Sequence, residues 1–293
     1  MDIRAILMGL AFAFMWSSAF TSARMIVADA PPLTALAARF LLSGVIACGL
    51  ALAMGQSWRL SRAQWRAVVI FGICQNALYL GLNFVAMQWV EASLAAIIAS
   101  SMPLLVAGFG WALFGDRVRP LGIAGLVAGM AGVALIMGSR LSGGTDLGGV
   151  ALCLLGSLAL TVATLSMRGA TGGGGNVMMV VGLQMFVGSA ALAVVALATE
   201  PFVVNWTPRL GWAFLYTTLV PGVLATWVWF LLVGRIGTVR ASTFHFLNPF
   251  FGVAVAAVLL GERLGWADVI GVLVIAGGIL AVQLSRQADR PAA

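Results

Sequence analysis

The feature that most constrains this chain is a series of ten long apolar runs, which together take up most of its 293 residues. Each run has about the roughly 20 residues that a helix needs to cross the hydrocarbon core of a membrane. Their approximate bounds are Ile3–Ser22, Leu33–Met54, Trp65–Trp89, Leu94–Phe114, Leu121–Gly138, Gly148–Met167, Val177–Thr199, Leu210–Val233, Ser242–Leu260 and Trp266–Leu284. The sequence therefore predicts an all-α membrane protein with ten transmembrane helices.

The composition excludes the main soluble classes. Only 9% of the residues are charged, against about 25% in an ordinary soluble domain, and the mean hydropathy is +1.07. We therefore expect neither a soluble enzyme nor a disordered chain, and no nucleic-acid binder despite the net charge of +7. Three cysteines and one histidine, which never cluster, predict no metal site, no cofactor and no disulfide framework.

The placement of the arginines predicts the orientation, because cytoplasmic loops of membrane proteins carry an excess of positive charge. With the N-terminus inside, the cytoplasmic segments carry Arg4, Arg59, Arg62, Arg66, Arg117, Arg119, Arg168, Arg235, Arg240, Arg286 and Arg290, and the outer segments carry Arg24, Arg140, Arg209 and Arg263. Both termini are therefore expected in the cytoplasm. The heavy use of arginine, alanine and glycine without lysine is typical of a GC-rich bacterial genome, which predicts an inner (cell) membrane.

The sequence also resembles itself at half its length. Pro249 follows Pro103 by 146 residues, and the same offset superposes Gly261-Glu262-Arg263 on Gly115-Asp116-Arg117. This predicts two five-helix repeats, residues 1–146 and 147–293, unless the matches are chance similarity among apolar helices. Because five is odd, the second repeat is inverted. Inverted repeats are typical of secondary transporters, whose substrate site lies near the midplane between the repeats.

Several short motifs carry a family resemblance. Met15-Trp16-Ser17-Ser18-Ala19-Phe20, Ala38-Arg39-Phe40, Leu113-Phe114-Gly115-Asp116-Arg117 and Leu259-Leu260-Gly261-Glu262-Arg263-Leu264 resemble the EamA-type repeat of the drug/metabolite transporter superfamily. The resemblance covers essentially the whole chain, twice. It implies a central cavity lined by helices 1–4 and 6–9, with helices 5 and 10 at the periphery, and a transporter of amino acids, aromatic and other neutral ones among them.

Polar side chains inside the membrane are costly and therefore informative. Helix 3 carries Asn76, Tyr79 and Asn83 on one face, and further polar groups lie on helices 6 and 9. The expected substrate contacts are Trp16, Phe20, Tyr79, Asn83, Ser101, Thr164, Trp227, His245 and Asn248. Hydrogen bonding between packed helices is the alternative role for the polar members, and lipid-facing or packed aromatics for the others. Trp229 is a further candidate beside Trp227.

Two prolines lie at matching places in helices 4 and 9. Proline removes a backbone donor and frees a carbonyl one turn back. We therefore expect both helices to bend near the midplane at Pro103 and Pro249, as hinges or as part of the cavity wall.

Glycines on helices 5 and 10 form smooth stripes. Gly122, Gly125, Gly129 and Gly132 share one face of helix 5, and Gly271 and Gly278 mark helix 10. Because small residues let helices approach closely, these stripes predict packing surfaces. A dimer contact is the alternative, but a duplicated chain is expected to function as a monomer.

Arg39 lies inside helix 2, roughly 9 Å below its end at about 1.5 Å per residue. Three roles stay open for it. Its side chain reaches the interface, it attracts a substrate carboxylate, or it pairs with a helix C-terminal carbonyl.

The nine acidic residues all lie in loops, tails or at helix ends. Ion-driven transporters usually keep a carboxylate in the cavity, so the sequence predicts alternating access without a coupling carboxylate. The alternative is an exporter of another small metabolite or drug, coupled to protons through His245. An intramembrane enzyme or a channel is a different class, and a lone histidine argues against the enzyme. The expected partners are a small-molecule substrate and the lipid bilayer.

Overall fold

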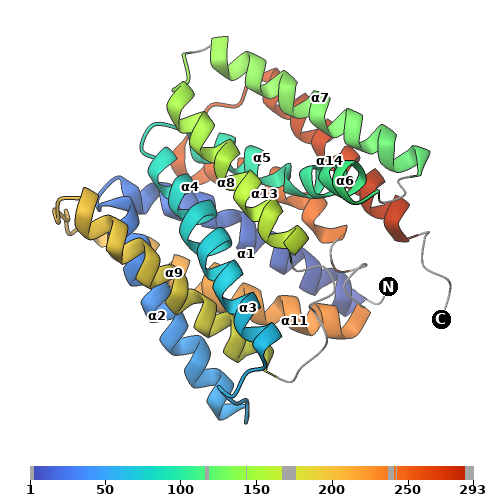
Figure 1. The fold of residues 1–293 in the computed structure, drawn as a ribbon. Coiled ribbons are helices and arrows are strands. Elements are labelled where there is room, and N and C mark those ends of the chain that lie inside the picture. Colours follow the sequence, from blue (N-terminus) through green and yellow to red (C-terminus); the bar gives the residue numbers. More distant parts are fainter. Residues whose placement is uncertain are drawn as a thin grey trace. The chain divides into compact units, whose positions relative to one another are not determined.

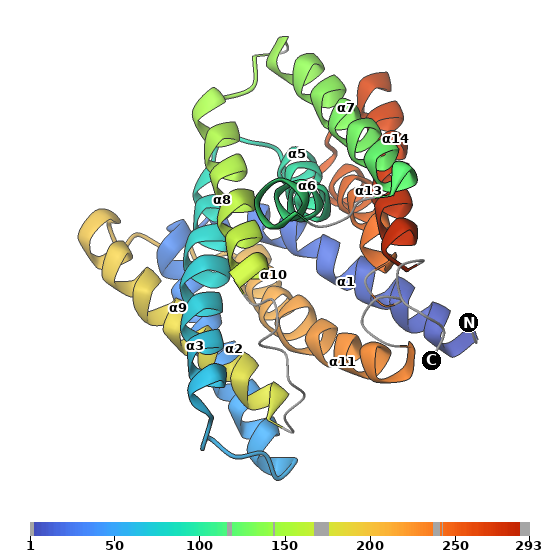
Figure 2. The same ribbon diagram turned by 45° about the vertical axis from the view of Figure 1, so that its right-hand side comes forward.

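The computed structural model describes residues 3–115, 119–142, 144–166, 176–236, 241 and 243–287 (Figures 1 and 2). In that part of the chain all regular structure is helical. The elements are α1 (Ile3–Val27), α2 (Pro32–Ala53), α3 (Arg62–Phe71), η1 (Gly72–Leu80), α4 (Gly81–Ala86), α5 (Ala92–Ser100), α6 (Met102–Phe114), α7 (Pro120–Ser142), α8 (Leu147–Ser166), α9 (Val177–Thr199), α10 (Pro208–Leu219), η2 (Val220–Leu224), α11 (Ala225–Ile236), η3 (Thr243–Leu247), α13 (Asn248–Leu260) and α14 (Trp266–Gln287).

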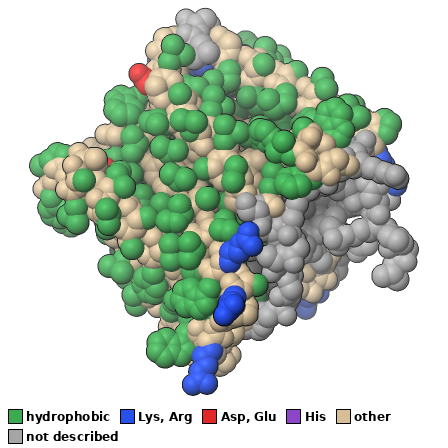
Figure 3. Space-filling view, in the orientation of Figure 1, with side chains coloured by type: hydrophobic (Ala, Val, Ile, Leu, Met, Phe, Trp, Pro, Cys, Tyr) green, Lys and Arg blue, Asp and Glu red, His purple; other side chains and the backbone are tan. Residues whose placement is uncertain are grey.

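These elements confirm the predicted helical fold. Among the described residues, 9 helices are long and apolar enough to cross a membrane, and a shorter apolar helix spans Phe244–Leu260. Each of the ten coincides with one of the ten apolar runs. Large apolar side chains also point outward, as expected of a protein that faces lipid rather than water. Leu197 is 88% exposed and Val258 is 81% exposed, and Figure 3 shows hydrophobic side chains spread over the face that it presents.

Four of the membrane helices are not continuous α-helices. Helix 4 is interrupted at Ser101, between α5 and α6, and helix 9 begins as the 3-10 turn η3 before α13. Prolines mark both places, because a proline cannot donate to the preceding turn. Helix 3 contains the π-helix η1 and helix 8 the π-helix η2. Pro221 marks the second of these, whereas the first contains no proline and begins at Gly72.

The chain divides into two compact units, and each contains parts of both halves of the sequence. Unit 1 consists of Met1–Thr21, Trp89–Val150 and Ala225–Ala293, and unit 2 of Ser22–Gln88 and Ala151–Leu224. The boundaries 1–146 and 147–293 describe repeats in the sequence and remain a prediction. The two units are described separately below.

In unit 1, α7 and α14 lie side by side (Figures 1 and 2) and touch through glycines. A Cβ placed on Gly125 would lie 2.7 Å from the carbonyl oxygen of Gly278, and one on Gly132 would lie 2.9 Å from that of Gly271. The two contacts are equivalent in the two sequence repeats, because Gly125 corresponds to Gly271 and Gly132 to Gly278 at the 146-residue offset. The glycine stripes are therefore a packing surface within the chain, where backbones meet without intervening side chains.

In unit 2, α2 and α9 form a similar pair. A Cβ on Gly44 would lie 3.1 Å from the carbonyl oxygen of Gly182, and the Ser189 hydroxyl donates to the Ala37 carbonyl at 2.8 Å. This hydroxyl connects two packed helices, so it acts as the kind of interhelical contact that serine makes in membranes.

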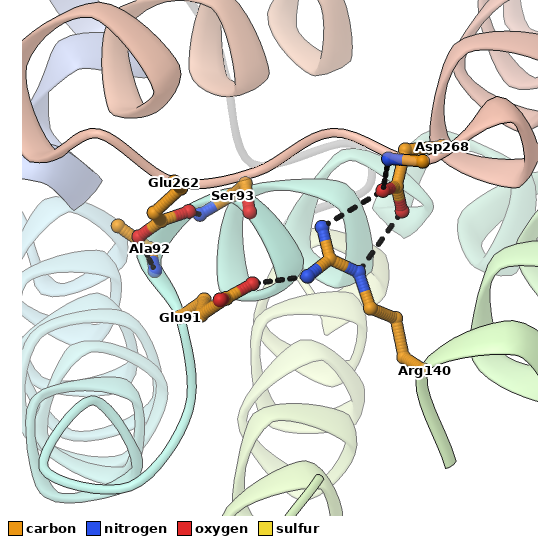
Figure 4. Close-up of polar contacts among 7 residues, drawn as sticks. Glu91, Ala92, Ser93, Arg140, Glu262 and Asp268 are labelled. Carbon is orange, nitrogen blue, oxygen red and sulfur yellow. Dashed lines mark hydrogen bonds and ion pairs between the residues drawn. The ribbon is translucent and has the colours of Figure 1, made fainter. Parts of the chain in front are cut away.

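A carboxylate from one helix end caps the start of another helix in each unit. In unit 1, Glu262, just past the end of α13, accepts from the backbone N–H groups of Ala92 (2.8 Å) and Ser93 (3.0 Å) at the start of α5 (Figure 4). In unit 2, Glu200 at the end of α9 accepts from Leu33 and Thr34 at the start of α2, both at 2.8 Å. The first N–H groups of a helix lack partners within it, and a negative charge there is favourable.

We predict that Glu262→Ala lowers the free energy of unfolding by about 1–3 kcal/mol, because it leaves two part-buried N–H groups without an acceptor. Glu262→Gln keeps one acceptor and should lose less. The midpoint of thermal unfolding of the detergent-purified protein measures both. Arg263→Ala, at the exposed neighbouring position, is the control. An equal effect of Arg263→Ala would contradict the capping role.

An ion network lies beside this cap. Arg140 at the end of α7 forms two 3.0 Å hydrogen bonds with Asp268 in the first turn of α14 and a third contact with Glu91 (Figure 4). Asp268 also accepts from the backbone N–H of Gly265 at 2.8 Å. Since α7 and α14 already touch through glycines, this network joins their ends to the start of α5.

Candidate functional site

The residues predicted to contact substrate fall into the two units. Unit 2 holds three of them, and unit 1 holds the others together with both predicted hinge prolines. Those of unit 2 are Tyr79, Asn83 and Thr164, and those of unit 1 are Trp16, Phe20, Ser101, Trp227, His245 and Asn248, with Pro103 and Pro249. The two groups are described in turn, and the predicted central cavity remains a prediction.

In unit 1, aromatic rings from two other helices surround His245. The ring of Phe12, on α1, meets the imidazole edge-on at 5.3 Å between centroids, and the ring of Trp229, on α11, lies at the same distance. Phe12 and Trp229 are themselves 4.7 Å apart, and Trp16 lies 5.8 Å from Phe12. These residues form an apolar cluster, the His245 cluster: Phe12, Trp16, Trp229 and His245.

Helix α1 can lie this close to η3 because it has a glycine at the contact. A Cβ on Gly9 would overlap the ring of Phe244 on η3. Gly9, Phe12 and Trp16 share one face of α1, since they are spaced by three and four residues. The spacing of small and aromatic residues on α1 therefore brings Phe12 and Trp16 to the cluster.

The polar partner of His245 is Asn248, one turn further along the chain. Its Nδ2 lies 3.0 Å from the imidazole Nδ1. The two nitrogens lie within hydrogen-bond distance, and which of them donates depends on the tautomer of the ring. No described carboxylate pairs with His245, so the imidazole has an amide rather than an ion pair as its polar neighbour.

Four polar atoms of unit 1 are buried without a hydrogen-bond partner among the described residues. They are Ser17 Oγ, Thr21 Oγ1, Ser93 Oγ and Asn248 Oδ1. Ser17 and Thr21 lie one turn apart on α1, and Asn248 is the residue bonded to His245. Buried polar atoms are nearly always hydrogen-bonded, so such exceptions point to a functional partner.

Other candidates of unit 1 lie outside this group of contacts. Ser101 donates to the Ile98 carbonyl of its own helix at 2.6 Å, which satisfies its hydroxyl. Phe20 is buried, although no ring contact joins it to the His245 cluster. Trp227 is about half exposed, at 48%, whereas Trp229 lies in the cluster. The sequence predicts only that both tryptophans lie deep in helix 8. The packing of α11 shows which of the two, Trp229, contacts the aromatic rings of unit 1.

In unit 2, Asn83 and Tyr79 lie against α8. Asn83 Nδ2 donates to the Tyr79 carbonyl at 2.8 Å, and its Oδ1 is buried without a partner. A Cβ on Gly156 would lie 2.9 Å from Asn83 Nδ2, so this glycine lets α8 approach. Asn76 instead donates to the Gln184 carbonyl on α9 at 3.0 Å. The polar face of helix 3 thus divides between a helix–helix contact and an unpartnered amide oxygen.

Thr164 resembles Ser101 rather than Asn83. Its hydroxyl donates to the Leu160 carbonyl of its own helix at 2.8 Å. This bond satisfies the donor within α8 and leaves the hydroxyl oxygen as an acceptor only.

The structure also contains a pocket that sequence reasoning missed. It has a volume of about 500 Å³ and lies in unit 1 at the helix ends that Arg140 joins. Its lining residues are Trp89, Glu91, Leu94, Ser139, Arg140, Gly144, Thr145 and Asp146. Two separate stretches of the chain, 89–94 and 139–146, build it, so no single motif marks it. Arg140 and Glu91 in its wall already pair with each other.

The carboxylates that the structure describes all act at helix ends or in loops. Asp29 accepts from Asn205 and Thr207, and Asp146 accepts from the Gly149 N–H. The other four, Glu91, Glu200, Glu262 and Asp268, belong to the caps and the network described above. Within the described ranges, no group of three or more metal-ligating side chains is found.

Comparisons with known proteins show the family of the chain. Residues 3–138 and 147–284 each match the EamA-like transporter family. The chain is 26% identical over 280 residues to the "Uncharacterized transporter YvbV" of Bacillus subtilis (strain 168), covering 95% of this chain and 91% of that protein. It is also 26% identical over 275 residues to the "Uncharacterized inner membrane transporter YedA" of Escherichia coli (strain K12), covering 93% and 88%. A third relative, "Protein PecM" of Dickeya dadantii (strain 3937), is 25% identical over 266 residues, covering 90% and 86%.

One solved crystal structure shows the same fold. It superposes with a TM-score of 0.71 at 21% sequence identity, covering 99% of this chain and 100% of that chain. At this identity the likeness concerns the fold alone.

Proposed function

Because the chain belongs to the EamA-like transporter family, we propose that it carries neutral amino acids, aromatic ones among them, across a bacterial inner membrane. The family match makes the chain a multi-pass membrane transporter rather than an enzyme. The choice of amino acids rests on the resemblance of its sequence to YddG, an exporter of aromatic and other amino acids. It also rests on the chemistry of the His245 cluster.

The observation that carries the proposal is the combination of aromatic rings with unpartnered polar atoms in unit 1. Phe12, Trp16 and Trp229 offer apolar faces that suit an aromatic or thioether side chain. Ser17 Oγ, Thr21 Oγ1 and Asn248 Oδ1 are free to bond a polar group. Sites for small molecules combine such apolar walls with a few polar groups in this way.

The proposed mechanism is alternating access, in which two inverted five-helix repeats move about a fixed substrate site. The interruptions at Ser101 and before Asn248 support Pro103 and Pro249 as hinges. The arginine distribution supports a cytoplasmic position for both termini, and a single chain is proposed to suffice for transport. The direction of transport then follows the substrate gradient.

Transport without a coupling ion is the second part of the proposal. Among the described residues, no carboxylate lies in the middle of a membrane helix, so the usual proton or sodium carrier is missing there. His245 has an amide and aromatic rings as neighbours and no carboxylate partner among the described residues. Proton coupling through His245, with another small metabolite or drug as the substrate, is the alternative.

Uptake into proteoliposomes tests the proposal. We expect saturable entry of labelled phenylalanine, methionine and threonine without any ion gradient, and no entry of a labelled sugar. A protonophore should leave the accumulated amount unchanged. Entry of the sugar but of no amino acid would contradict the substrate class. Accumulation against a gradient that collapses with protonophore would instead establish coupling, and His245→Ala should then abolish it.

A further inference from the structure

Unit 2 contains a buried charged side chain, Arg39, which is not one of the predicted substrate contacts. Its burial inside a membrane helix needs an explanation. Arg39 is the eighth residue of α2, so its Cα lies roughly 10 Å along the helix from its start at about 1.5 Å per residue. The residue is 5% exposed. It therefore does not extend to the membrane interface, which excludes the first of the three roles considered above.

Arg39 lies against helix 8 where that helix bulges at the π-helix η2 (Val220–Leu224). Its Nε donates to the Thr217 carbonyl at 3.2 Å, one turn before Pro221 in the π-helix η2. Proline has no N–H, so the carbonyl groups in the preceding turn have fewer donors within the helix. Gly222 lets Ser43 on α2 lie close to this bulge, since a Cβ there would be 3.0 Å from Ser43 Oγ and 3.2 Å from the Thr217 carbonyl oxygen.

A guanidinium has five N–H donors, and this one contact uses the donor on Nε. The four N–H groups on Nη1 and Nη2 have no acceptor among the described residues. No ion pair joins Arg39 to a carboxylate in the described part of the chain, where all the acids are engaged at helix ends or in loops. The guanidinium carbon also lies 5.1 Å from the centre of the Phe40 ring, a cation–π contact. This contact compensates only part of the cost of a buried charge, particularly in a membrane, so the arrangement favours a ligand of opposite charge.

Support of the bulge does not explain the charge. Ser43, one turn further along α2, donates to the neighbouring Thr218 carbonyl at 3.2 Å and does so with a neutral hydroxyl. The same helix thus supports two adjacent carbonyls of the bulge, one with a hydroxyl and one with a cation. A neutral donor suffices for that task, so the positive charge of Arg39 serves something else.

We propose that Arg39 is an anion-binding subsite that takes the carboxylate of the transported substrate. The planar fork of Nη1 and Nη2 matches a carboxylate in two parallel hydrogen bonds. This deepens the proposed function and rests on it. It restricts the substrate to molecules with a carboxylate, so amino acids are carried and the corresponding amides, amines and sugars are not.

Two measurements test the subsite, one of binding and one of transport. The first is the thermal stabilisation of purified protein in detergent by phenylalanine, 3-phenylpropionate, phenylalaninamide and sodium chloride. The second is competition by unlabelled phenylalanine or phenylalaninamide against labelled phenylalanine uptake in proteoliposomes. The wild-type protein should be stabilised by both carboxylates, and phenylalaninamide should compete at least tenfold more weakly than phenylalanine.

Variants separate binding from support of the bulge. Arg39→Gln should raise the KM for phenylalanine at least tenfold and remove the preference over phenylalaninamide, while Arg39→Lys retains part of both. Ser43→Ala removes the neutral contact to the same bulge and should leave the preference unchanged. Size-exclusion chromatography checks that each variant is folded. The preference of the wild-type protein for phenylalanine over phenylalaninamide is measured without any substitution, so it tests the proposal even if a variant does not fold.

Three results would overturn the proposal. The first is that wild-type protein does not distinguish phenylalanine from phenylalaninamide, although amino-acid uptake is present. The second is that Arg39→Gln lowers uptake but keeps the preference, which would mean a structural role. The third is that chloride stabilises the protein as much as a carboxylate does, which would mean a resident inorganic anion. Absence of any amino-acid uptake together with stabilisation by 3-phenylpropionate that Arg39→Gln removes would contradict the proposed amino-acid function but support the anion site.

Discussion

Replacing Gly278 with alanine is expected to destabilise the protein by about 2–3 kcal/mol, the upper part of the usual range for overpacking. A Cβ there would lie 2.5 Å from the Gly125 carbonyl oxygen and 2.7 Å from the Gly129 backbone nitrogen. Both are backbone atoms of α7, so no side chain can rotate away and the two helices must separate. The midpoint of thermal unfolding in detergent should fall by roughly 5–10 °C.

The control for this substitution is the neighbouring residue. Gly277 has open space where its Cβ would be, so Gly277→Ala meets no atom and gains the helix propensity of alanine, about 1 kcal/mol. We expect an unchanged or slightly higher unfolding midpoint. If Gly278→Ala and Gly277→Ala behave alike, the glycine contact between α7 and α14 does not hold these helices together.

Replacing Trp229 with alanine is expected to lower kcat/KM for phenylalanine uptake at least tenfold, or about 1.4 kcal/mol. The substitution removes ring contacts to both Phe12 and His245, and each aromatic pair contributes about 0.5–1.5 kcal/mol beyond its buried area. Initial rates of labelled phenylalanine uptake in proteoliposomes measure the effect. Trp229→Phe keeps a ring and should recover much of the activity.

Trp266→Ala is the matched control, since Trp266 also lies in unit 1 but is 83% exposed at the start of α14. Its kcat/KM should stay within about twofold of wild type, because it contacts no residue of the His245 cluster. A similar loss in both variants would indicate general damage from removing a tryptophan. A normal rate for Trp229→Ala would place the substrate site away from the cluster.

The sequence could suggest which residues are candidates for the site, but not which atoms they contact. Tyr79, Asn83, His245 and Asn248 are all buried or half-buried polar residues, as expected of polar groups kept from lipid. Phe12 was not predicted, although its spacing of four residues from Trp16 places both on one face of α1. Hydroxyl groups were the least predictable. Ser101 and Thr164 bond their own helices, and nothing in their sequence neighbourhood distinguishes them from Ser17, which has no partner.

The helical interruptions show the same limit. The breaks in helices 4 and 9 were expected because proline lacks the N–H that a helix requires. The π-helix in helix 3 was not expected, since Gly72–Leu80 contains no proline. Glycines let this part of helix 3 pack closely against α9. Gly72 and Gly188 lie at the contact, where a Cβ on Gly72 would be 2.9 Å from the Gln184 carbonyl oxygen.

The sequence by itself determined the fold class and the approximate ends of ten membrane helices, because each helix satisfies its backbone internally and needs only an apolar run of sufficient length. Only the tertiary structure decided what the sparse charges do. Glu262 and Glu200 cap helices about 170 residues away in the chain, and Arg39 donates to the Thr217 carbonyl, 178 residues away. Such partners are set by which helix backbones pack together, and interactions at that separation leave no local pattern in the sequence.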